Sequence, residues 1–210
     1  MRPSSQQIGQ SQKAKLLAQI SKQLEKLTSV IGRNITTTTT SSTTTTTTTI
    51  YSIGDLALGG VIGYILQPGD EGYTPSVQKG LVVALTDMPS TTTWGCPGTL
   101  LPGTYSLAIG TGEQNTINII TNCTTAGIAA KVCSDYTEGG YTDWYLPSAL
   151  DLVALYDNKT IIGGFSPVYY WSSTQTSAAN AGAITFAEPD PVFFQLPKNS
   201  LRRVRAIRSF

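Results

Sequence analysis

GGYTDWYLPSALDLVALYDN, residues 139–158, places a glycine pair, a tryptophan and a helix start within one short stretch. Gly139 and Gly140 permit a tight turn with positive φ. Leu146 must be extended because a proline follows it, and Pro147 is a favoured first residue of a helix. Trp144 is expected to be a buried anchor. The predicted helix presents an apolar face made of Leu150, Leu152, Val153, Leu155 and Tyr156.

The segments on either side of this stretch predict a domain that mixes strands and helices. Two helices are expected at 114–122 and 126–136, on either side of Cys123. Trp171 is a second expected core residue. Short apolar runs between Gly, Pro and Asp predict strands at 61–66, 80–85, 169–174, 183–186, 192–196 and 204–210. Strands followed by helices and then strands again are typical of the α+β class.

Residues 11–32 carry a different pattern, which predicts a helix that associates with other chains. Its apolar side chains are spaced 3-4-3-4 along a heptad seam, and they are Leu17, Ile20, Leu24, Leu27 and Ile31. A lone helix with such a stripe needs a partner to cover it. We expect a homo-oligomer, most simply a trimer. Docking into a partner protein, or back onto the chain's own domain, would also cover the stripe.

A threonine tract separates this helix from the globular part. Residues 36–49 contain only threonine and serine, so they cannot form a packed core. Fully extended, the tract would span about 46 Å at ~3.3 Å per residue. The predicted organisation is therefore an oligomerising or anchoring helix in residues 1–35, a linker or stalk in 36–50, and a recognition domain in 51–210.

The composition argues against several functional classes. The chain has no histidine, which removes the Ser-His-Asp triad and the HExxH zinc site, so no catalytic residues and no cofactor are expected. Residues 34–197 carry twelve acids against three lysines, which argues against a broad nucleic-acid surface. The arginines of 202–208 are expected to pair with those acids in a final strand. The apolar run 56–66 is too short and too glycine-rich to span a bilayer, and no secretion signal is expected in residues 1–30.

Three cysteines leave the redox state of the chain open. Cys96, Cys123 and Cys133 have no CxxC spacing, so no zinc site is expected. One disulfide with one free thiol, and no disulfide at all, both fit this spacing.

A family resemblance emerges when the stretch 139–158 is taken together with YYWSST (169–174) and RRVRAIRSF (202–210). These motifs resemble the C-terminal domain of the Legionella collagen-like adhesins, over about residues 58–210. The upstream motifs that fit are GGVIGYI (59–65), GLVVALTD (80–87), WGCPGT (94–99), AIGTGEQNT (108–116) and AAKVC (129–133). The resemblance implies a C-type-lectin-like fold, which formylglycine-generating enzymes also use, and a role in adhesion. Tyr145 stands where family members often have Arg, so a salt bridge at that position is not carried over.

The resemblance also suggests where a ligand would bind. Domains of this kind that are diversified by retroelements vary near the C-terminus, which corresponds here to 175–201; an ordinary lectin surface without diversification is the alternative. Glu188-Pro189-Asp190 is similar to the calcium–sugar signature of true C-type lectins, but a second ligand cluster is missing, so no metal is expected. The candidate ligand-binding residues are Tyr169, Tyr170, Thr176, Gly182, Ala183, Thr185, Ala187, Glu188, Asp190, Val192 and Phe194.

The N-terminal segment is similar to a leader of virion proteins from phages that infect Bacteroidetes-like hosts. The leading hypothesis is therefore a phage virion protein, a fibre or capsid decoration, assembled in the host cytoplasm. Its N-terminal helix would join other virion proteins, and its lectin-like domain would attach to a host surface glycan or protein. A bacterial cell-surface adhesin of the same family is the alternative. An enzyme of the formylglycine-generating class would need a reactive cysteine pair, which the sequence does not suggest.

Overall fold

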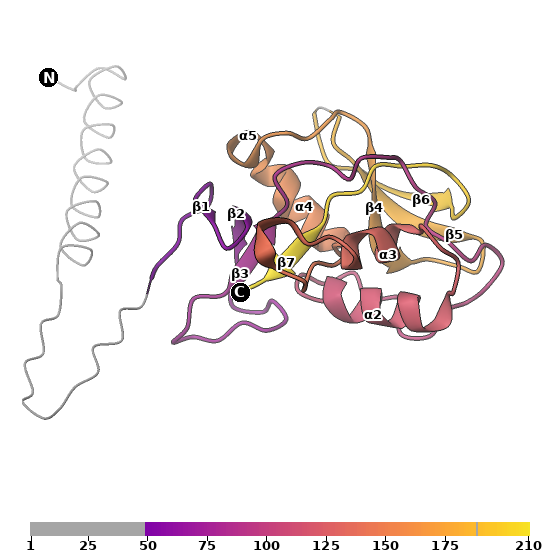
Figure 1. Ribbon diagram of the computed structural model, residues 1–210, viewed down its shortest axis with the longest axis horizontal. Coiled ribbons are helices and arrows are strands. Elements are labelled where there is room, and N and C mark those ends of the chain that lie inside the picture. The colour runs from indigo at the N-terminus through magenta and orange to yellow at the C-terminus, as the bar shows by residue number, and fades with distance from the viewer. Residues whose placement is uncertain (1–48, 188) are drawn as a thin grey trace, which may run out of the picture. The chain divides into compact units, whose positions relative to one another are not determined.

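The computed structural model describes residues 49–187 and 189–210 (Figure 1). The predicted helix with its heptad seam, the threonine tract up to residue 48 and Glu188 lie outside the described residues. The elements in chain order are β1 (Leu56–Ala57), β2 (Gly60–Ile65), β3 (Gly80–Val83), α2 (Gly112–Asn122), α3 (Ala129–Ser134), the 3-10 helix η1 (Glu138–Gly140), α4 (Ala149–Asp157), α5 (Lys159–Ile162), β4 (Tyr169–Gln175), β5 (Asn180–Thr185), β6 (Phe193–Pro197) and β7 (Ile207–Ser209). The α+β prediction is confirmed.

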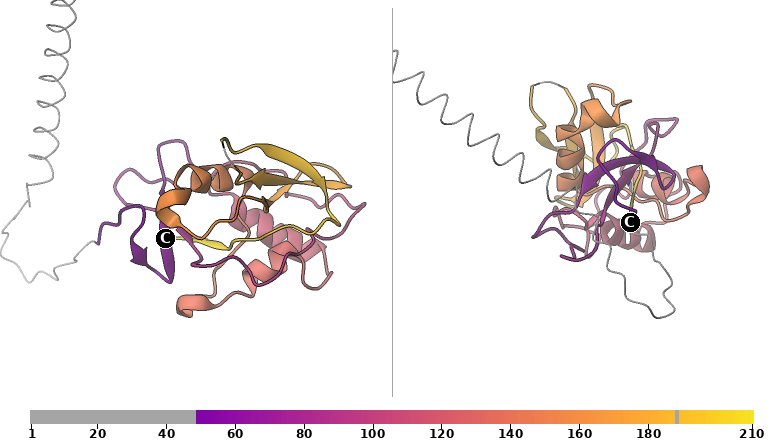
Figure 2. Two further views of the ribbon diagram at one scale, coloured as in Figure 1. Left: turned by 90° about the horizontal axis from the view of Figure 1, so that it is seen from above. Right: turned by 90° about the vertical axis from the view of Figure 1, so that its left-hand side faces the viewer.

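The strands form two antiparallel sheets near opposite ends of the described domain (Figures 1 and 2). The first has the order β1-β2-β3-β7, so the C-terminal strand returns to pair with β3, with Val83 opposite Ile207. The second has the order β4-β5-β6, with β5 between its two neighbours in sequence. The start and the end of the domain are therefore held in one sheet.

Strand β4 separates two hydrophobic cores because its side chains alternate between faces. Trp171 is fully buried and packs with Trp94, Trp144 and residues of α2 and α3. Tyr170, the residue before it, is equally buried but packs with the apolar face of α4. The indole of Trp171 donates to the carbonyl of Thr92 at 2.9 Å, so this core residue also satisfies its polar atom. Burial of both predicted tryptophan anchors is confirmed.

Helix α4 begins later than predicted. Ser148 is its N-cap: the Ser148 hydroxyl accepts from the Asp151 amide at 3.1 Å, and the Asp151 carboxylate accepts from the Ser148 amide at 2.8 Å. This reciprocal capping box starts the helix at Ala149, two residues after Pro147. Leu150 is exposed, because it lies on the outer side of the first turn, so its predicted place on the core face was wrong.

Three of the four arginines in 202–208 form the ion pairs that the sequence predicted, and Arg202 does not. Arg205 is buried and binds Asp87 at 2.7 Å, and Arg203 reaches the same carboxylate at 3.4 Å. Arg208 forms two 2.7 Å bonds with Asp143, which holds the pKa of that carboxyl below its ordinary value. These pairs tie β7 and the segment before it to distant loops.

Cys96 and Cys123 form a disulfide, and Cys133 is a free, buried thiol. Of the two states that the spacing allowed, the structure therefore has one bridge. It connects the loop after β3 to the C-terminal end of α2, where Cys123 is the C-cap residue. No helix in 49–187 or 189–210 is long and apolar enough to cross a membrane.

Candidate recognition surfaces

Three of the predicted contact positions are buried and cannot form an exposed surface: Tyr170, Gly182 and Ala183. Tyr170 donates its hydroxyl hydrogen to Asp87 at 2.7 Å and accepts from the Ser166 amide, and burial raises its pKa to about 12. Gly182 lies on the central strand, where an added Cβ would come within 2.5 Å of the Phe193 ring. The small residues of this segment mark a tightly packed inner strand, where a contact surface was expected.

The other described candidates reach the surface to different extents. Asp190, Val192 and Phe194 are exposed, whereas Tyr169, Thr185 and Ala187 are half-buried. Thr176 is also half-buried, and its hydroxyl is shielded without a hydrogen-bond partner. The exposed candidates therefore lie toward the end of the sheet near the β5–β6 connection.

Four candidate residues at this end of the second sheet lie on one face. Tyr169 is opposite Thr185, whose amide donates to Val192 at 3.1 Å, and Phe194 is opposite Ala183 on the same face. Two residues farther along β4, the core covers the same face at Trp171. Trp171 pairs with Ala183 from the β4 side, just as Phe194 pairs with it from the β6 side. The rings of Tyr169 and Phe194 meet edge to face at 5.1 Å, so each limits the other's motion. We call Tyr169, Thr185, Val192, Phe194 and the neighbouring Arg202 the sheet-end surface.

Arg202 is the member that the sequence analysis missed. Its guanidinium lies over the Tyr169 ring, 5.6 Å from the centroid, and Nη1 donates to the Leu201 carbonyl at 2.7 Å. Its Nε is shielded from solvent without a partner, and no carboxylate pairs with it in the described part of the chain. Side chains alternate in direction along extended backbone, which explains why Arg202 lacks the partner that its neighbours have. Arg203 and Arg205 both reach Asp87, so Arg202 points to the opposite side.

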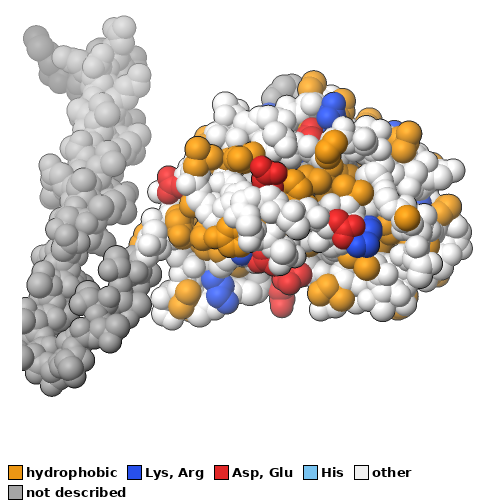
Figure 3. Space-filling view, in the orientation of Figure 1, with side chains coloured by type: hydrophobic (Ala, Val, Ile, Leu, Met, Phe, Trp, Pro, Cys, Tyr) orange, Lys and Arg blue, Asp and Glu red, His pale blue; other side chains and the backbone are white. Residues whose placement is uncertain are grey.

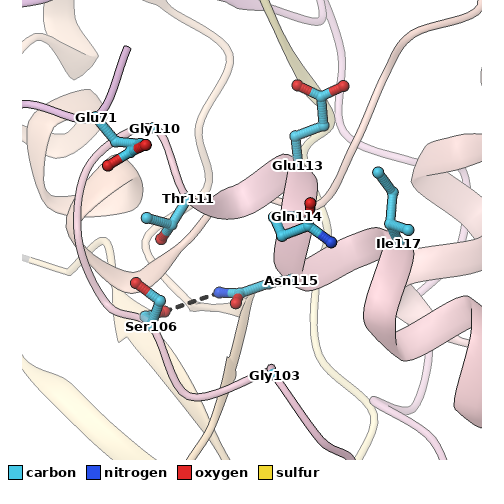
Figure 4. Close-up of a pocket in the computed structure, with 9 residues that line it drawn as sticks. All are labelled: Glu71, Gly103, Ser106, Gly110, Thr111, Glu113, Gln114, Asn115 and Ile117. Carbon is cyan, nitrogen blue, oxygen red and sulfur yellow. Dashed lines mark hydrogen bonds between the residues drawn. The ribbon is translucent and has the colours of Figure 1, made fainter. Parts of the chain in front are cut away.

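A second candidate site is a hollow of about 460 Å³ beside α2, which we call the α2 hollow (Figure 4). Three separate segments build it: the loop after β2, the loop before α2, and the exposed side of α2 itself. Its lining residues are Glu71, Gly103, Ser106, Gly110, Thr111, Glu113, Gln114, Asn115 and Ile117. A smaller hollow of about 350 Å³ shares Glu71, Gly110 and Glu113 with it. Residues 108–116 carry one of the family motifs, and the sequence alone predicts no site there.

The face shown in the space-filling view carries few charged side chains, and its apolar groups are scattered among neutral polar ones (Figure 3). Within the described ranges, no group of three His, Cys, Asp or Glu side chains could hold a metal ion. Burial raises the pKa of the Cys133 thiol, so this free cysteine is held in its neutral form. The sheet-end surface and the α2 hollow are therefore two exposed candidates for a binding site.

Comparison with known proteins gives a likeness to a solved structure. No family model matches the chain, and no curated protein matches it. A fimbrial protein from Bacteroides ovatus ATCC 8483 has a similar crystal structure, with a TM-score of 0.50 and 16% sequence identity. The match covers 72% of this chain but only 44% of the fimbrial protein, so the chain corresponds to less than half of that protein. At this identity the likeness concerns the fold alone.

Proposed function

We propose that this chain is an attachment protein that binds its target without chemical change, through a recognition domain in residues 49–210. The observation that carries the proposal is the sheet-end surface. It presents two aromatic rings on strands that are anchored in the core, and beside them an arginine that pairs with no carboxylate among the described residues. Aromatic residues and arginine are enriched among the residues that dominate binding energy at protein interfaces. A rigid support reduces the ordering entropy that is lost on binding.

We further propose that the recognition domain is C-type-lectin-like. Three features support this: β7 returns to the first sheet beside β3, α2 and α4 contribute to different cores, and the second sheet lies between those cores. The sequence motifs from 58 to 210 support the same assignment. The ligand would be a protein or glycan on a cell surface.

Two kinds of carrier, a phage particle and a bacterial cell, fit an attachment protein of this kind. The leading one is a phage fibre or capsid decoration, in which Leu17, Ile20, Leu24, Leu27 and Ile31 assemble three chains and join them to the virion. The second is a bacterial surface adhesin. The Cys96–Cys123 disulfide supports exposure to an oxidising environment, which both carriers provide outside the cell. The likeness in fold to a fimbrial protein supports the second carrier, the bacterial cell surface.

The test uses the full chain, fluorescently labelled, on a panel of Bacteroidetes cells. We expect the double substitution Phe194→Ala and Arg202→Gln to lower attachment by at least about tenfold, because two central contacts are lost. Thermal stability should remain nearly unchanged, since Phe194 is exposed and Arg202 has no ion pair in the described residues.

Two controls make the result specific. Arg203→Gln removes the neighbouring positive charge but leaves the sheet-end surface intact, so attachment should persist. Trp171→Ala should instead cost about 3–5 kcal/mol of stability, as large core truncations do. Full attachment by the Phe194/Arg202 variant, or an equal loss in Arg203→Gln, would place the contact surface elsewhere.

A further inference from the structure

The α2 hollow has walls that are fixed by hydrogen bonds before any ligand arrives. The buried Asn115 side chain donates to the Ser106 carbonyl at 2.8 Å, and Asn118 donates to the Gly103 carbonyl at 2.7 Å. The Glu71 amide donates to the Ile109 carbonyl at 3.2 Å. Each bond joins two of the segments that line the hollow, and Figure 4 shows the one between Asn115 and Ser106. A site that is already ordered loses little entropy on binding.

Polar groups on these walls remain available to a ligand. The carboxylates of Glu71 and Glu113 make no hydrogen bond or ion pair within the described residues, although both line the hollow. The Ser106 hydroxyl is exposed and has no partner in the same part of the chain. The Gln114 amide nitrogen donates to Asn118 at 3.1 Å, which leaves its oxygen free. Ile117, 50% exposed, adds an apolar patch to the same wall.

We propose that the α2 hollow binds a neutral saccharide through its hydroxyl groups. Ionised carboxylates only accept hydrogen bonds, and hydroxyl groups can both donate and accept. Adjacent sugar hydroxyls would donate to Glu71, Glu113 and the Gln114 oxygen, while the Ser106 hydroxyl donates in return. The carbon–hydrogen face of the ring would pack on Ile117. A hollow of about 460 Å³ lies within the size range of small-molecule sites.

The same walls disfavour charged ligands. An anion would be repelled by Glu71 and Glu113. A calcium ion takes six to eight oxygen ligands, and no group of three acidic or sulfur ligands occurs in the described ranges. A single ammonium group would gain little from exposed carboxylates, because solvent screens such pairs. A neutral polyol gains several hydrogen bonds at once, so it fits these walls best.

This site is distinct from the sheet-end surface and shares no residue with it, so the two proposals can fail separately. The experiment is saturation-transfer difference NMR on the full chain, with methyl α-D-mannopyranoside, methyl β-D-galactopyranoside and methyl β-D-glucopyranoside as probes. We expect saturable transfer to at least one glycoside. Glu113→Gln should weaken that binding about five- to tenfold, because a neutral amide oxygen replaces the charged acceptor and a charge-assisted hydrogen bond is roughly twice as strong as a neutral one. Ser106→Trp, which fills the hollow from an exposed position, should abolish it.

Glu138→Gln is the matched control, because Glu138 is an exposed glutamate on η1 that does not line the hollow. It should leave binding unchanged. The proposal is overturned if none of the three glycosides shows saturable transfer, or if Glu113→Gln and Glu138→Gln behave alike. It is also overturned if ethylammonium or calcium chloride binds at the same residues and the glycosides do not. Should Ser106→Trp misfold, the comparison between the two glutamate variants still decides. Glycoside binding that persists in the Phe194/Arg202 variant would show that the two sites are independent.

Discussion

Lys198 is completely buried although no carboxylate of the described chain neutralises it. Its Nζ donates to the Thr99 carbonyl at 2.7 Å and to the Gln175 side-chain oxygen at 2.5 Å, and lies 4.6 Å from the Trp94 ring centroid. Burial lowers the pKa of Lys198 from 10.5 to about 8. The charge is therefore tolerated at a cost, which the neighbouring acceptors and the aromatic ring reduce.

This lowered pKa gives stability a pH dependence of defined sign. The unfolded chain keeps the Lys198 proton up to about pH 10.5, whereas the native state releases it at about pH 8. Between these values the unfolded state binds more protons, so native stability rises with pH. We expect the wild type to gain about 1–2 kcal/mol relative to Lys198→Met between pH 8 and 9.5. Urea unfolding of both proteins at several pH values measures this gain; a constant or falling difference would contradict it.

Single residues also mark the limit of what the sequence could predict. The burial of Trp144 and Trp171 followed from their size and their apolar surroundings. The burial of Gly182 did not, because a glycine in a polar, small-residue segment also suits an exposed turn. A buried strand and an exposed turn are distinguished here only by a tertiary contact, because the Phe193 ring fills the space beside Gly182. Arg202 was missed for the same reason, since strand alternation identifies an unpaired arginine only once its neighbours' partners are known.

At the scale of elements, the Cys96–Cys123 disulfide fixes a long, irregular loop to helix α2. The two cysteines lie 27 positions apart in the sequence, and the chain between Cys96 and the start of α2 at Gly112 has no regular structure. The bridge therefore limits the freedom of the unfolded chain where local structure does little. The same loop supplies Gly103 and Ser106 to the α2 hollow. Loss of the bridge should thus lower the stability of the domain more than it changes the α2 hollow.

Replacing Cys96 and Cys123 together with serine should lower stability by about 3–4 kcal/mol, the chain-entropy value for a loop of this length. Cys133 should react with iodoacetamide only after unfolding, because its side chain is fully buried. Mass spectrometry should therefore count no labelled thiol in the native chain, one after unfolding, and three after unfolding with reduction. Equal stability of the double variant, or three thiols without reduction, would show that the bridge does not form.

At the scale of the whole molecule, the heptad seam in 11–32 would decide how many recognition domains act together. The longer helices and strands of the domain were predictable in type, because their apolar periodicities are local features of the sequence, whereas the short elements β1, η1 and α5 were not predicted. The sites were only partly predictable, because both combine loops that are distant in sequence. If each single domain binds weakly, several domains on one stalk raise overall avidity without any new contact. The heptad seam and the recognition domain would thus act together in attachment, the first by assembling chains and the second by binding the target.

We therefore expect the full chain to be a trimer, with three times the 22.3 kDa mass of one chain in multi-angle light scattering. Placing Asp at Ile20 and Leu24 should yield monomers, since two charges would interrupt the apolar seam. The monomer should keep the thermal midpoint of the recognition domain, whose two cores lie within residues 49–210. Its attachment to cells should fall by about 100-fold or more, the scale of lost avidity, whereas glycoside binding per chain should not change. A full chain that is monomeric, or an oligomer that survives both substitutions, would favour a helix that docks into a partner protein.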